Sequence, residues 1–279
     1  MKRKPVVAGA FYPAAPQALT KMVADMIDST APKVGAIGFV SPHAGYVYSG
    51  QVAGAVISHV RFEDTCIVLA PNHTGLGAPF SLWPDGAWET PLGSVAIDDI
   101  LRRELLKHSA HLAEDTTAHL REHSLEVQLP FLQYCKPDVK IVPIVLGKAT
   151  TDDYQALGHE IAHVLAAMGR RATILASSDM THYEPHSVVK YKDQLAIEAI
   201  LELNAKALVS RLAEHHITMC GYAPVLVLIA AARKLGATIG ELVHYQTSGD
   251  TSGNYESVVG YAGIIVKEEE HDFTASTVG

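Results

Sequence analysis

Four residues of types that bind metals or move protons each follow a short apolar segment typical of a buried strand. They are His43, His73, Asp179 and His182. Ligand sites in open α/β sheets form beyond the carboxyl ends of the strands, so we expect these side chains to share one cleft. His43 and His73 also have a proline shortly before and a glycine shortly after them. This shared pattern favours a common role as metal ligands.

Cys220 is a fifth candidate, because it directly precedes a helical pattern at 221–233 that has Pro224 in its first turn. The unpaired N–H groups and the dipole at a helix N-terminus stabilise a thiolate. A thiolate with two imidazoles suits zinc, copper or iron. The alternative interpretation is structural: Cys220 as a small buried side chain, Asp179 as a turn cap and His182 as a surface residue.

One local motif suggests different chemistry. His159, Glu160 and His163 spell H-E-x-x-H, the signature of zinc metallopeptidases. At about 100° per residue, the apolar side chains of the helix predicted at 152–168 cluster on one arc, and the two histidines point away from it. A peptidase would also need a third ligand, for which Glu184 is the nearest candidate downstream. We keep this function as the least favoured alternative.

The elements expected to position these residues alternate between strands and helices. The predicted strands are 34–40, 65–70, 139–146, 172–177, 241–246 and 257–266. The predicted helices are 17–29, 50–60, 98–107, 124–135, 152–168, 187–201, 204–215 and 221–235. This alternation predicts an α/β fold with a central, mostly parallel or mixed sheet and helices on both faces. Without a linker or repeat, residues 1–279 are expected to form a single domain that ends in a frayed polar tail at 267–279.

Two further expectations concern the middle of the chain. The irregular stretch 75–93 carries Trp83 and Trp88, and we expect a long loop or hairpin that shields the pocket or forms a subunit contact. His119 has polar neighbours in the sequence and is expected to be solvated.

Composition limits the class of protein. Of 279 residues, 48% are hydrophobic and 19% are charged, which is enough apolar material for a core and excludes a disordered chain. The net charge is −8, and without a basic stripe no nucleic-acid partner is expected.

No apolar run approaches the roughly 20 residues of a membrane span, and no signal-peptide core follows the basic N-terminus. Three scattered cysteines predict a reduced, cytoplasmic protein.

Taken together, these segments resemble the Memo family, which is related to the class III, or LigB-type, extradiol dioxygenases. The resemblance runs from Arg3 to the last predicted strand and rests on short pieces in matching order. They are Pro42-His-Ala-Gly-Tyr46, Pro71-Asn-His73, Trp88-Glu-Thr-Pro-Leu-Gly93, Glu122-His-Ser-Leu-Glu126, Ser177-Ser-Asp-Met-Thr-His182 and Cys220-Gly221.

The resemblance implies a LigB-like fold and a metal site made of His43, His73 and Cys220. It also implies catalytic residues beside the metal, namely His182, Asp179 and His123. In the related dioxygenases two histidines and a glutamate hold Fe(II), and Cys220 takes the place of that glutamate here. A thiolate favours softer metals and can itself be oxidised, which weighs against ring cleavage.

Two classes of function follow from these residues. The first is a metal-dependent redox enzyme using iron or copper, with zinc also compatible. In it His182 would act as general acid/base, and Asp179 would orient an imidazole. The second is a non-enzymatic module that binds a peptide or small ligand in the ancestral pocket. We predict the first, on an unidentified substrate, and expect a homodimer because the dioxygenase relatives are often oligomeric.

Overall fold

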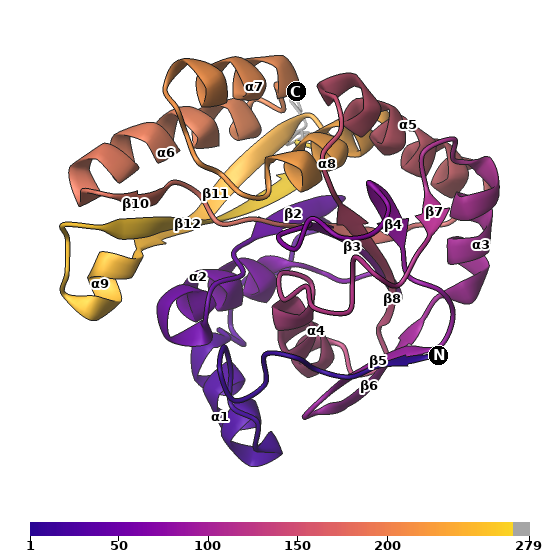
Figure 1. Ribbon diagram of the computed structural model, residues 1–279, viewed down its shortest axis with the longest axis horizontal. Coiled ribbons are helices and arrows are strands. Elements are labelled where there is room, and N and C mark those ends of the chain that lie inside the picture. The colour runs from indigo at the N-terminus through magenta and orange to yellow at the C-terminus, as the bar shows by residue number, and fades with distance from the viewer. Residues whose placement is uncertain (270–279) are drawn as a thin grey trace, which may run out of the picture.

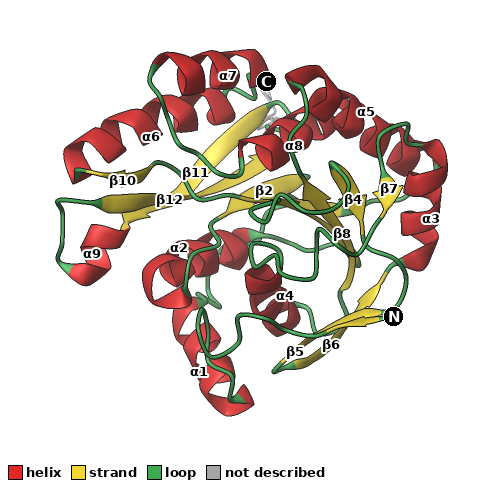
Figure 2. Cartoon of the chain, in the orientation of Figure 1, coloured by secondary structure: helices red, strands yellow, loops and turns green. Residues whose placement is uncertain are grey.

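The computed structural model describes residues 1–269 and shows one large sheet between two layers of helices (Figures 1 and 2). The strands are β1 (Lys2–Arg3), β2 (Gly38–Ser41), β3 (Thr65–Pro71), β4 (Phe80–Leu82), β5 (Ala87–Thr90), β6 (Gly93–Ile97), β7 (Ala113–Glu114), β8 (Lys140–Leu146), β9 (Thr173–Ser177), β10 (His182–Glu184), β11 (Ile239–Thr247) and β12 (Val258–Lys267). The tail predicted to fray lies outside the described residues from 270 onward.

The central strands of the sheet are parallel. Along the order β8-β3-β9-β2, Leu69 of β3 pairs with Ile144 of β8 on one side and with Ala176 of β9 on the other. Every residue of β3 is buried, as expected for a parallel strand covered on both faces. The far side of β2 pairs with the antiparallel strand β12, so the sheet is mixed, as predicted.

Helices cover both faces of the sheet (Figure 1). They are α1 (Pro16–Met26), α2 (Tyr46–His59), α3 (Asp99–His108), the 3-10 turn η1 (Glu126–Gln128), α4 (Leu129–Cys135), α5 (Thr151–Ala167), α6 (His186–Leu201), α7 (Ala205–Glu214), α8 (Tyr222–Lys234) and α9 (Ser248–Ser252). Alternate side chains of β3 enter opposite cores: Ile67 and Leu69 pack with α5 and α8, whereas Cys66 and Val68 pack with α1, α2 and α4. This is the period of two that a strand imposes.

The fold prediction is confirmed in class and in most element positions. One predicted helix, 124–135, is divided into η1 and α4, and Pro130 lies in the first turn of α4, where a proline is tolerated because it lacks only an N–H that has no helical partner. Within residues 1–269, no helix combines the length and hydrophobicity needed to cross a bilayer.

The stretch 75–93 forms a hairpin in part, because β5 pairs antiparallel with β6, but its two tryptophans do not lie at the pocket. Both indoles are fully buried and pack edge to face at 5.7 Å between ring centroids. They belong to the core beneath α1 and α4, so these side chains neither shield the pocket nor offer a subunit contact. Their stretch forms the short strands β4 and β5.

The expectation for His119 is also wrong. Its side chain is completely buried between the two indoles, and Nε2 contacts the carbonyl oxygen of Ser81 at 3.1 Å.

Candidate metal centre at the strand ends

Three neighbouring parallel strands bring the predicted residues to one edge of the sheet. His43 follows β2, His73 follows β3 and Asp179 follows β9, and these strands are adjacent in the order β3-β9-β2. Apolar strand residues give way to polar ones where each strand leaves the sheet, so the side chains converge there. They open into a cavity of about 780 Å³ that is also lined by His123, His182 and Cys220.

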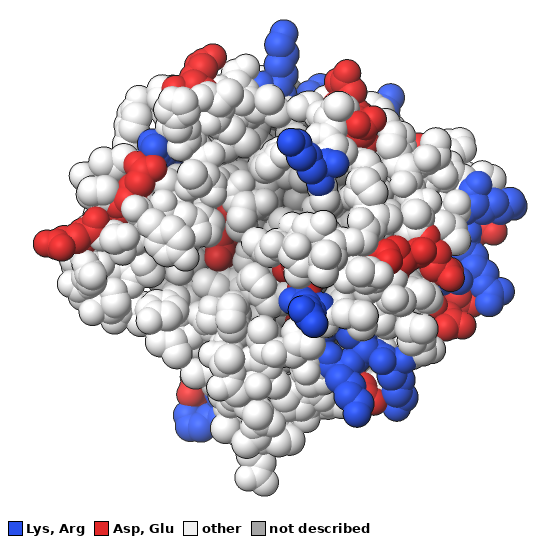
Figure 3. All heavy atoms as spheres, in the orientation of Figure 1, with Lys and Arg blue, Asp and Glu red and all other residues white. Residues whose placement is uncertain are grey.

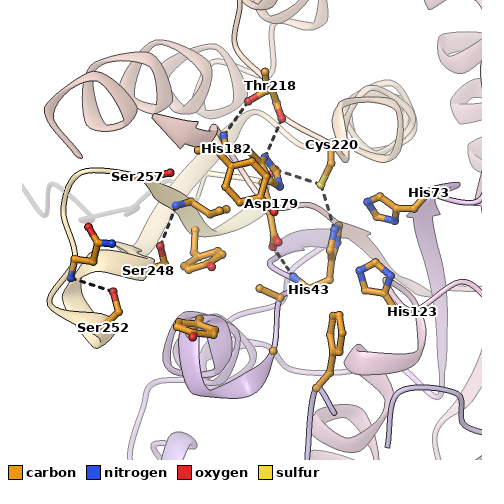
Figure 4. Close-up of a pocket in the computed structure, with 18 residues that line it drawn as sticks. His43, His73, His123, Asp179, His182, Thr218, Cys220, Ser248, Ser252 and Ser257 are labelled. Atoms are coloured by element: carbon orange, nitrogen blue, oxygen red, sulfur yellow. Dashed lines mark hydrogen bonds between the residues drawn. The ribbon is translucent and has the colours of Figure 1, made fainter. Parts of the chain in front are cut away.

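Three imidazoles lie closest together in this cavity. One ligand atom from each of His43, His73 and His123 lies within 4.8 Å of the others. In Figure 4 they face the same space as Cys220, while Ser248 and Ser257 lie across the pocket. His43 stands edge-on to His73, with an interplanar angle of 79°, whereas His73 and His123 stack at 26°. Part of the predicted site is therefore preassembled.

Hydrogen bonds fix which nitrogen of His43 faces the cavity. Its Nδ1 lies 2.9 Å from Oγ of Ser177, and that hydroxyl already donates to the carbonyl oxygen of Ser124 at 2.7 Å. The hydroxyl therefore accepts from Nδ1–H, which leaves the lone pair of His43 on Nε2. An imidazole oriented through its second nitrogen in this way is typical of metal-binding histidines.

Glu122 orients the second imidazole. Its buried carboxylate accepts hydrogen bonds from Nδ1 of His73 at 2.9 Å and from the His73 backbone N–H at 2.6 Å. The same carboxylate accepts from the Ser124 hydroxyl at 2.7 Å. Nδ1 of His123 is farther away, at 3.4 Å. Glu122 therefore holds His73 firmly, with Nε2 free, and holds His123 loosely.

Burial lowers the pKa of two of the three imidazoles, whereas a neighbouring carboxylate raises the pKa of the third. Burial lowers the pKa of His43 well below its ordinary value and also lowers the pKa of His123. Burial alone would lower the pKa of His73 too, but the hydrogen bond and negative charge of Glu122 outweigh it and raise that pKa. Burial also opposes ionisation of Glu122, yet hydrogen bonds from His73 and Ser124 lower its pKa to about 2. A neutral His43 has a lone pair for a cation, whereas Glu122 makes a proton compete more strongly with a cation for His73.

Cys220 lies against the first imidazole. Its Sγ is 3.1 Å from Nε2 of His43 and 3.7 Å from the carbonyl oxygen of Asp179. Burial raises the pKa of the thiol, so without a cation the S–H donates to the Nε2 lone pair. Within residues 1–269, the group with all ligand atoms inside 4.8 Å contains His123 in place of Cys220.

Asp179 and His182 both form hydrogen bonds to backbone groups, Asp179 as an acceptor and His182 as a donor. Asp179 accepts a hydrogen bond from the backbone N–H of His43 at 2.7 Å, so it fixes the loop after β2 instead of an imidazole ring. Burial raises the pKa of its carboxyl group. His182 donates from Nδ1 to the carbonyl oxygen of Thr218 at 3.0 Å, which leaves the lone pair on Nε2 available for proton transfer.

The donor set fits a transition metal. His43 and His73 each have one nitrogen anchored and the other free, and a thiol lies beside the first. Imidazole suits zinc, copper, iron and nickel, and thiolate favours the softer ions among metals of this kind. Calcium and magnesium need several oxygen ligands, which this cluster does not offer.

The H-E-x-x-H motif of α5 does not form such a site. His159 and His163 are exposed, and they border two different surface hollows. The carboxylate of Glu160 accepts from the Ser109 hydroxyl and from Nδ1 of His111. In the described part of the chain, the metal-ligand cluster lies at the strand ends and not on this helix.

Sequence reasoning missed the groups that support the site. Arg3 donates to the Glu122 carbonyl oxygen at 2.6 Å and forms a buried ion pair with Glu126 at 2.7 Å. Glu126 also accepts from the Tyr12 hydroxyl at 2.7 Å, and the Phe11 ring packs on His123 at 4.8 Å. The N-terminal segment therefore braces the loop that carries Glu122. The available signal was the pair of carboxylates on either side of His123, Glu122 just before the predicted helix 124–135 and Glu126 in its first turn.

Fold and site together define a mixed α/β protein with a histidine- and cysteine-lined pocket beyond the carboxyl ends of its parallel strands. Its residues 3–265 match the family model described as Memo-like protein. The chain belongs to this family, which confirms the resemblance, including the relationship to the LigB-type dioxygenases.

Relatives at about the same length support this assignment. A MEMO1 family protein of Desulfurococcus amylolyticus is 42% identical, with 94% of this chain and 98% of the relative covered. One from Methanopyrus kandleri is 40% identical, with 96% and 99% covered. One from Aquifex aeolicus is 43% identical, with 94% and 98% covered.

A solved structure supports the fold alone. The crystal structure of an uncharacterized protein from Escherichia coli K12 aligns with a TM-score of 0.55 at 13% identity and covers 82% of this chain and 98% of that chain.

Proposed function

We propose that this protein binds a redox-active metal ion, iron or copper, at the strand ends and oxidises a small organic molecule there. The observation that carries the proposal is the preassembled cluster in which ligand atoms of His43, His73 and His123 lie within 4.8 Å of one another. Three imidazoles this close together repel one another if they protonate, and binding one cation through their lone pairs would remove that repulsion.

Ring orientation favours His43, His73 and Cys220 as the ligands. A metal ion binds an imidazole along the lone pair, in the plane of the ring. One ion lies in the planes of His43 and His73, which are edge-on at 79°, more readily than in those of His73 and His123, which are stacked at 26°. Of the stacked pair, His73 is the one anchored by Glu122. Cys220 contacts Nε2 of His43, so its thiol proton is the one that metal binding would release.

The surrounding residues would serve a bound substrate. Iron or copper supplies one-electron redox chemistry when bound. His182 presents Nε2 to the cavity and can take a proton from a substrate hydroxyl, because Thr218 fixes its Nδ1–H. Asp179 keeps the loop after β2 in place through the His43 backbone. Phe11 and His123 pack against each other and form one side of the cavity.

The test is metal analysis together with turnover. We expect protein prepared without oxygen to contain close to one iron or copper per chain. We also expect it to consume oxygen with a suitable organic reductant, and His43→Ala to lose both properties. Wild-type protein without metal above background would contradict the proposal.

A second candidate function is a binding module without turnover. The cavity of about 780 Å³ is within the range that holds small organic ligands, and a thiol stands where the dioxygenases have a carboxylate. Ligand binding that persists after metal removal and in Cys220→Ser would favour this function. The cytoplasmic location and the homodimer expected from the sequence also remain proposals, and size measurement in solution tests the second.

A further inference from the structure

One residue of the pocket has an unusual backbone. Within residues 1–269, the non-glycine residues with positive φ are Tyr183 at 60°, Leu203 at 50° and His216 at 50°. Side chains with a Cβ atom adopt this left-handed region at a cost in free energy. The cost needs an explanation at each position.

Helix termination explains two of the three. Leu203 lies just beyond the end of α6, and His216 lies just beyond the end of α7. The following N–H groups, of Asn204 and Ile217, reach back to carbonyl oxygens of the preceding helix at 2.9 and 3.0 Å. This is the usual left-handed ending of a helix. Tyr183 has no such role, because it lies in strand β10.

The conformation of Tyr183 produces a bulge in the sheet. His182 pairs with Val259 and Glu184 pairs with Val258, so the register between β10 and β12 shifts at Tyr183. A bulge redirects the side chain of the extra residue out of the regular pleat, and bulges are frequent next to active sites. Here the Tyr183 side chain is 77% exposed, yet it lines the pocket beside His182, with 5.6 Å between the two ring centroids.

The segment before the bulge is fixed on three sides. The Thr181 carbonyl oxygen accepts from the Gly260 N–H at 2.9 Å, and the Thr181 N–H donates to the buried carboxylate of Asp193 at 2.9 Å. The His182 N–H donates to the Thr218 hydroxyl at 2.8 Å. Strained residues persist where their surroundings hold them in this way. An exposed phenol ring gains little packing that would offset the strain within the protein.

The rest of the lining indicates what the ring could contact. The described lining residues include no lysine or arginine, so apart from the imidazoles and a bound metal ion the pocket offers no cation to a phosphate or carboxylate group. They do include the aromatic residues Phe11, Tyr48, Tyr183 and Tyr261 and the hydroxyl groups of Ser248 and Ser257. Figure 3 shows large areas of this face without charged side chains. Such a lining suits an uncharged ligand with a flat, unsaturated part and hydrogen-bonding groups.

We propose that Tyr183 is a specificity-determining ligand contact, held at the mouth of the pocket by the bulge, whose ring stacks on a flat, uncharged part of the ligand. This inference rests on the proposed function insofar as it assigns a contact in the same pocket. It does not depend on which metal ion is bound.

Probe molecules test the contact without the natural ligand. 2-Naphthol is flat, and decahydro-2-naphthol has the same size and hydroxyl group without aromatic faces. 2-Naphthyl phosphate adds the anion. Affinities of the three for the full chain are compared by calorimetry or ligand-observed NMR, for wild type, Tyr183→Gly, Tyr183→Phe and His216→Gly. His216→Gly is the matched control, because it relieves positive φ at an exposed residue outside the pocket.

We expect wild type and Tyr183→Phe to prefer 2-naphthol over its saturated analogue, and both to bind the phosphate more weakly when they are free of metal. In Tyr183→Gly the ratio of the affinities for 2-naphthol and its saturated analogue should fall by roughly 2- to 10-fold, the range expected for one aromatic pair. The thermal midpoint of this variant should equal or exceed that of wild type, because glycine adopts positive φ without strain. His216→Gly should gain stability similarly and keep the preference.

Three results would overturn the inference. They are an unchanged preference in Tyr183→Gly, an equal loss in Tyr183→Phe, and a marked loss of stability in Tyr183→Gly, which would assign a structural role to the ring. Metal content of the same samples separates the two proposals. Metal-free wild type that retains the ring-dependent preference contradicts the proposed function alone, and metal-loaded wild type without any preference contradicts the Tyr183 contact alone.

Discussion

Two histidine-containing regions of this molecule contrast sharply. Helix α5 has a complete H-E-x-x-H motif within five residues, yet His159 and His163 are exposed and its glutamate is engaged by Ser109 and His111. At the strand ends, His43 and His73 have no common motif of that kind, yet their rings stand edge-on with 5.2 Å between centroids. Spacing along the chain is therefore a weaker guide to a cluster of possible metal ligands than the place where neighbouring strands end.

The two regions also differ in the hydrogen bonds that orient their imidazole rings. The strand-end imidazoles are oriented from behind by Ser177 and Glu122, whereas no hydrogen bond orients the rings of the α5 histidines among the contacts of the described residues. Metal affinity depends on such supporting groups as well as on the ligands. The following experiments compare the two regions.

Removing two histidines from each region gives the largest contrast. We expect His43→Ala/His73→Ala to lose all stoichiometric metal and His159→Ala/His163→Ala to keep it. Elemental analysis of the two double variants, prepared in parallel, measures this. Loss of metal only from the α5 variant would restore the peptidase alternative.

The next experiment identifies the third ligand. Cys220→Ser should weaken binding of Co(II), used as a spectroscopic probe, by more than about 100-fold, the upper end of the effect of losing a supporting group. His123→Ala should weaken it much less, because its ring stacks on His73. A thiolate-to-cobalt absorption band should appear in wild type and in His123→Ala and be absent from Cys220→Ser. The opposite pattern would assign His123 as the ligand.

Glutamate-to-glutamine exchange compares the supporting groups. Glu122→Gln should weaken metal binding by roughly 10- to 100-fold, because the amide orients His73 less well. Glu160→Gln is the matched change in α5. It should leave metal affinity unchanged and lower the free energy of unfolding by about 1 kcal/mol through weakened hydrogen bonds to Ser109 and His111. Equal effects of the two changes on metal affinity would show that Glu122 has no special role.

The smallest effect is a shift in pH dependence. Protons compete with the metal for His73, whose pKa Glu122 raises above the ordinary 6.5, so affinity should fall as the pH drops through that raised pKa. In Glu122→Gln the midpoint should move to lower pH, because burial alone lowers the pKa of this imidazole. In metal-free protein the pH dependence concerns the free energy of unfolding and runs in the opposite direction. The raised pKa of His73 stabilises the fold below about pH 6.5, and this stabilisation is lost as the pH rises through the raised pKa. Metal titrations from pH 5 to 8 measure the first effect, and an unmoved midpoint would contradict it.

The sequence was sufficient to predict β2, β3, β8, β9, β11 and β12 and the convergence of the parallel strand ends, whereas the short strands β1, β4, β5, β6, β7 and β10 were not predicted. Apolar segments such as 65–70 have a clear signal because both of their faces are buried in a parallel sheet. Since parallel neighbours end at the same edge, the position of His43 near His73 and Asp179 followed without knowledge of the strand order.

Other parts depend on contacts that no local pattern records. His119 is buried only because distant tryptophans enclose it. The role of Glu122 depends on Arg3, which is 119 positions away. The bulge at Tyr183 depends on Asp193 and on Gly260, where a Cβ atom would meet the Asp193 carboxylate at 1.7 Å. Periodicity reports which face of an element is buried, but it does not report which distant group will be its neighbour.

The sheet order also has a consequence for biosynthesis. Strand β2 emerges early from the ribosome, but its neighbours β9 and β12 are translated much later. The contact between His43 and Cys220 joins residues 177 positions apart. Nascent chains cannot form pairings whose partners have not been made. Assembly of the pocket must therefore follow translation of nearly the whole chain, and until then the edges of β2 are open to chaperones or to incorrect strand pairing.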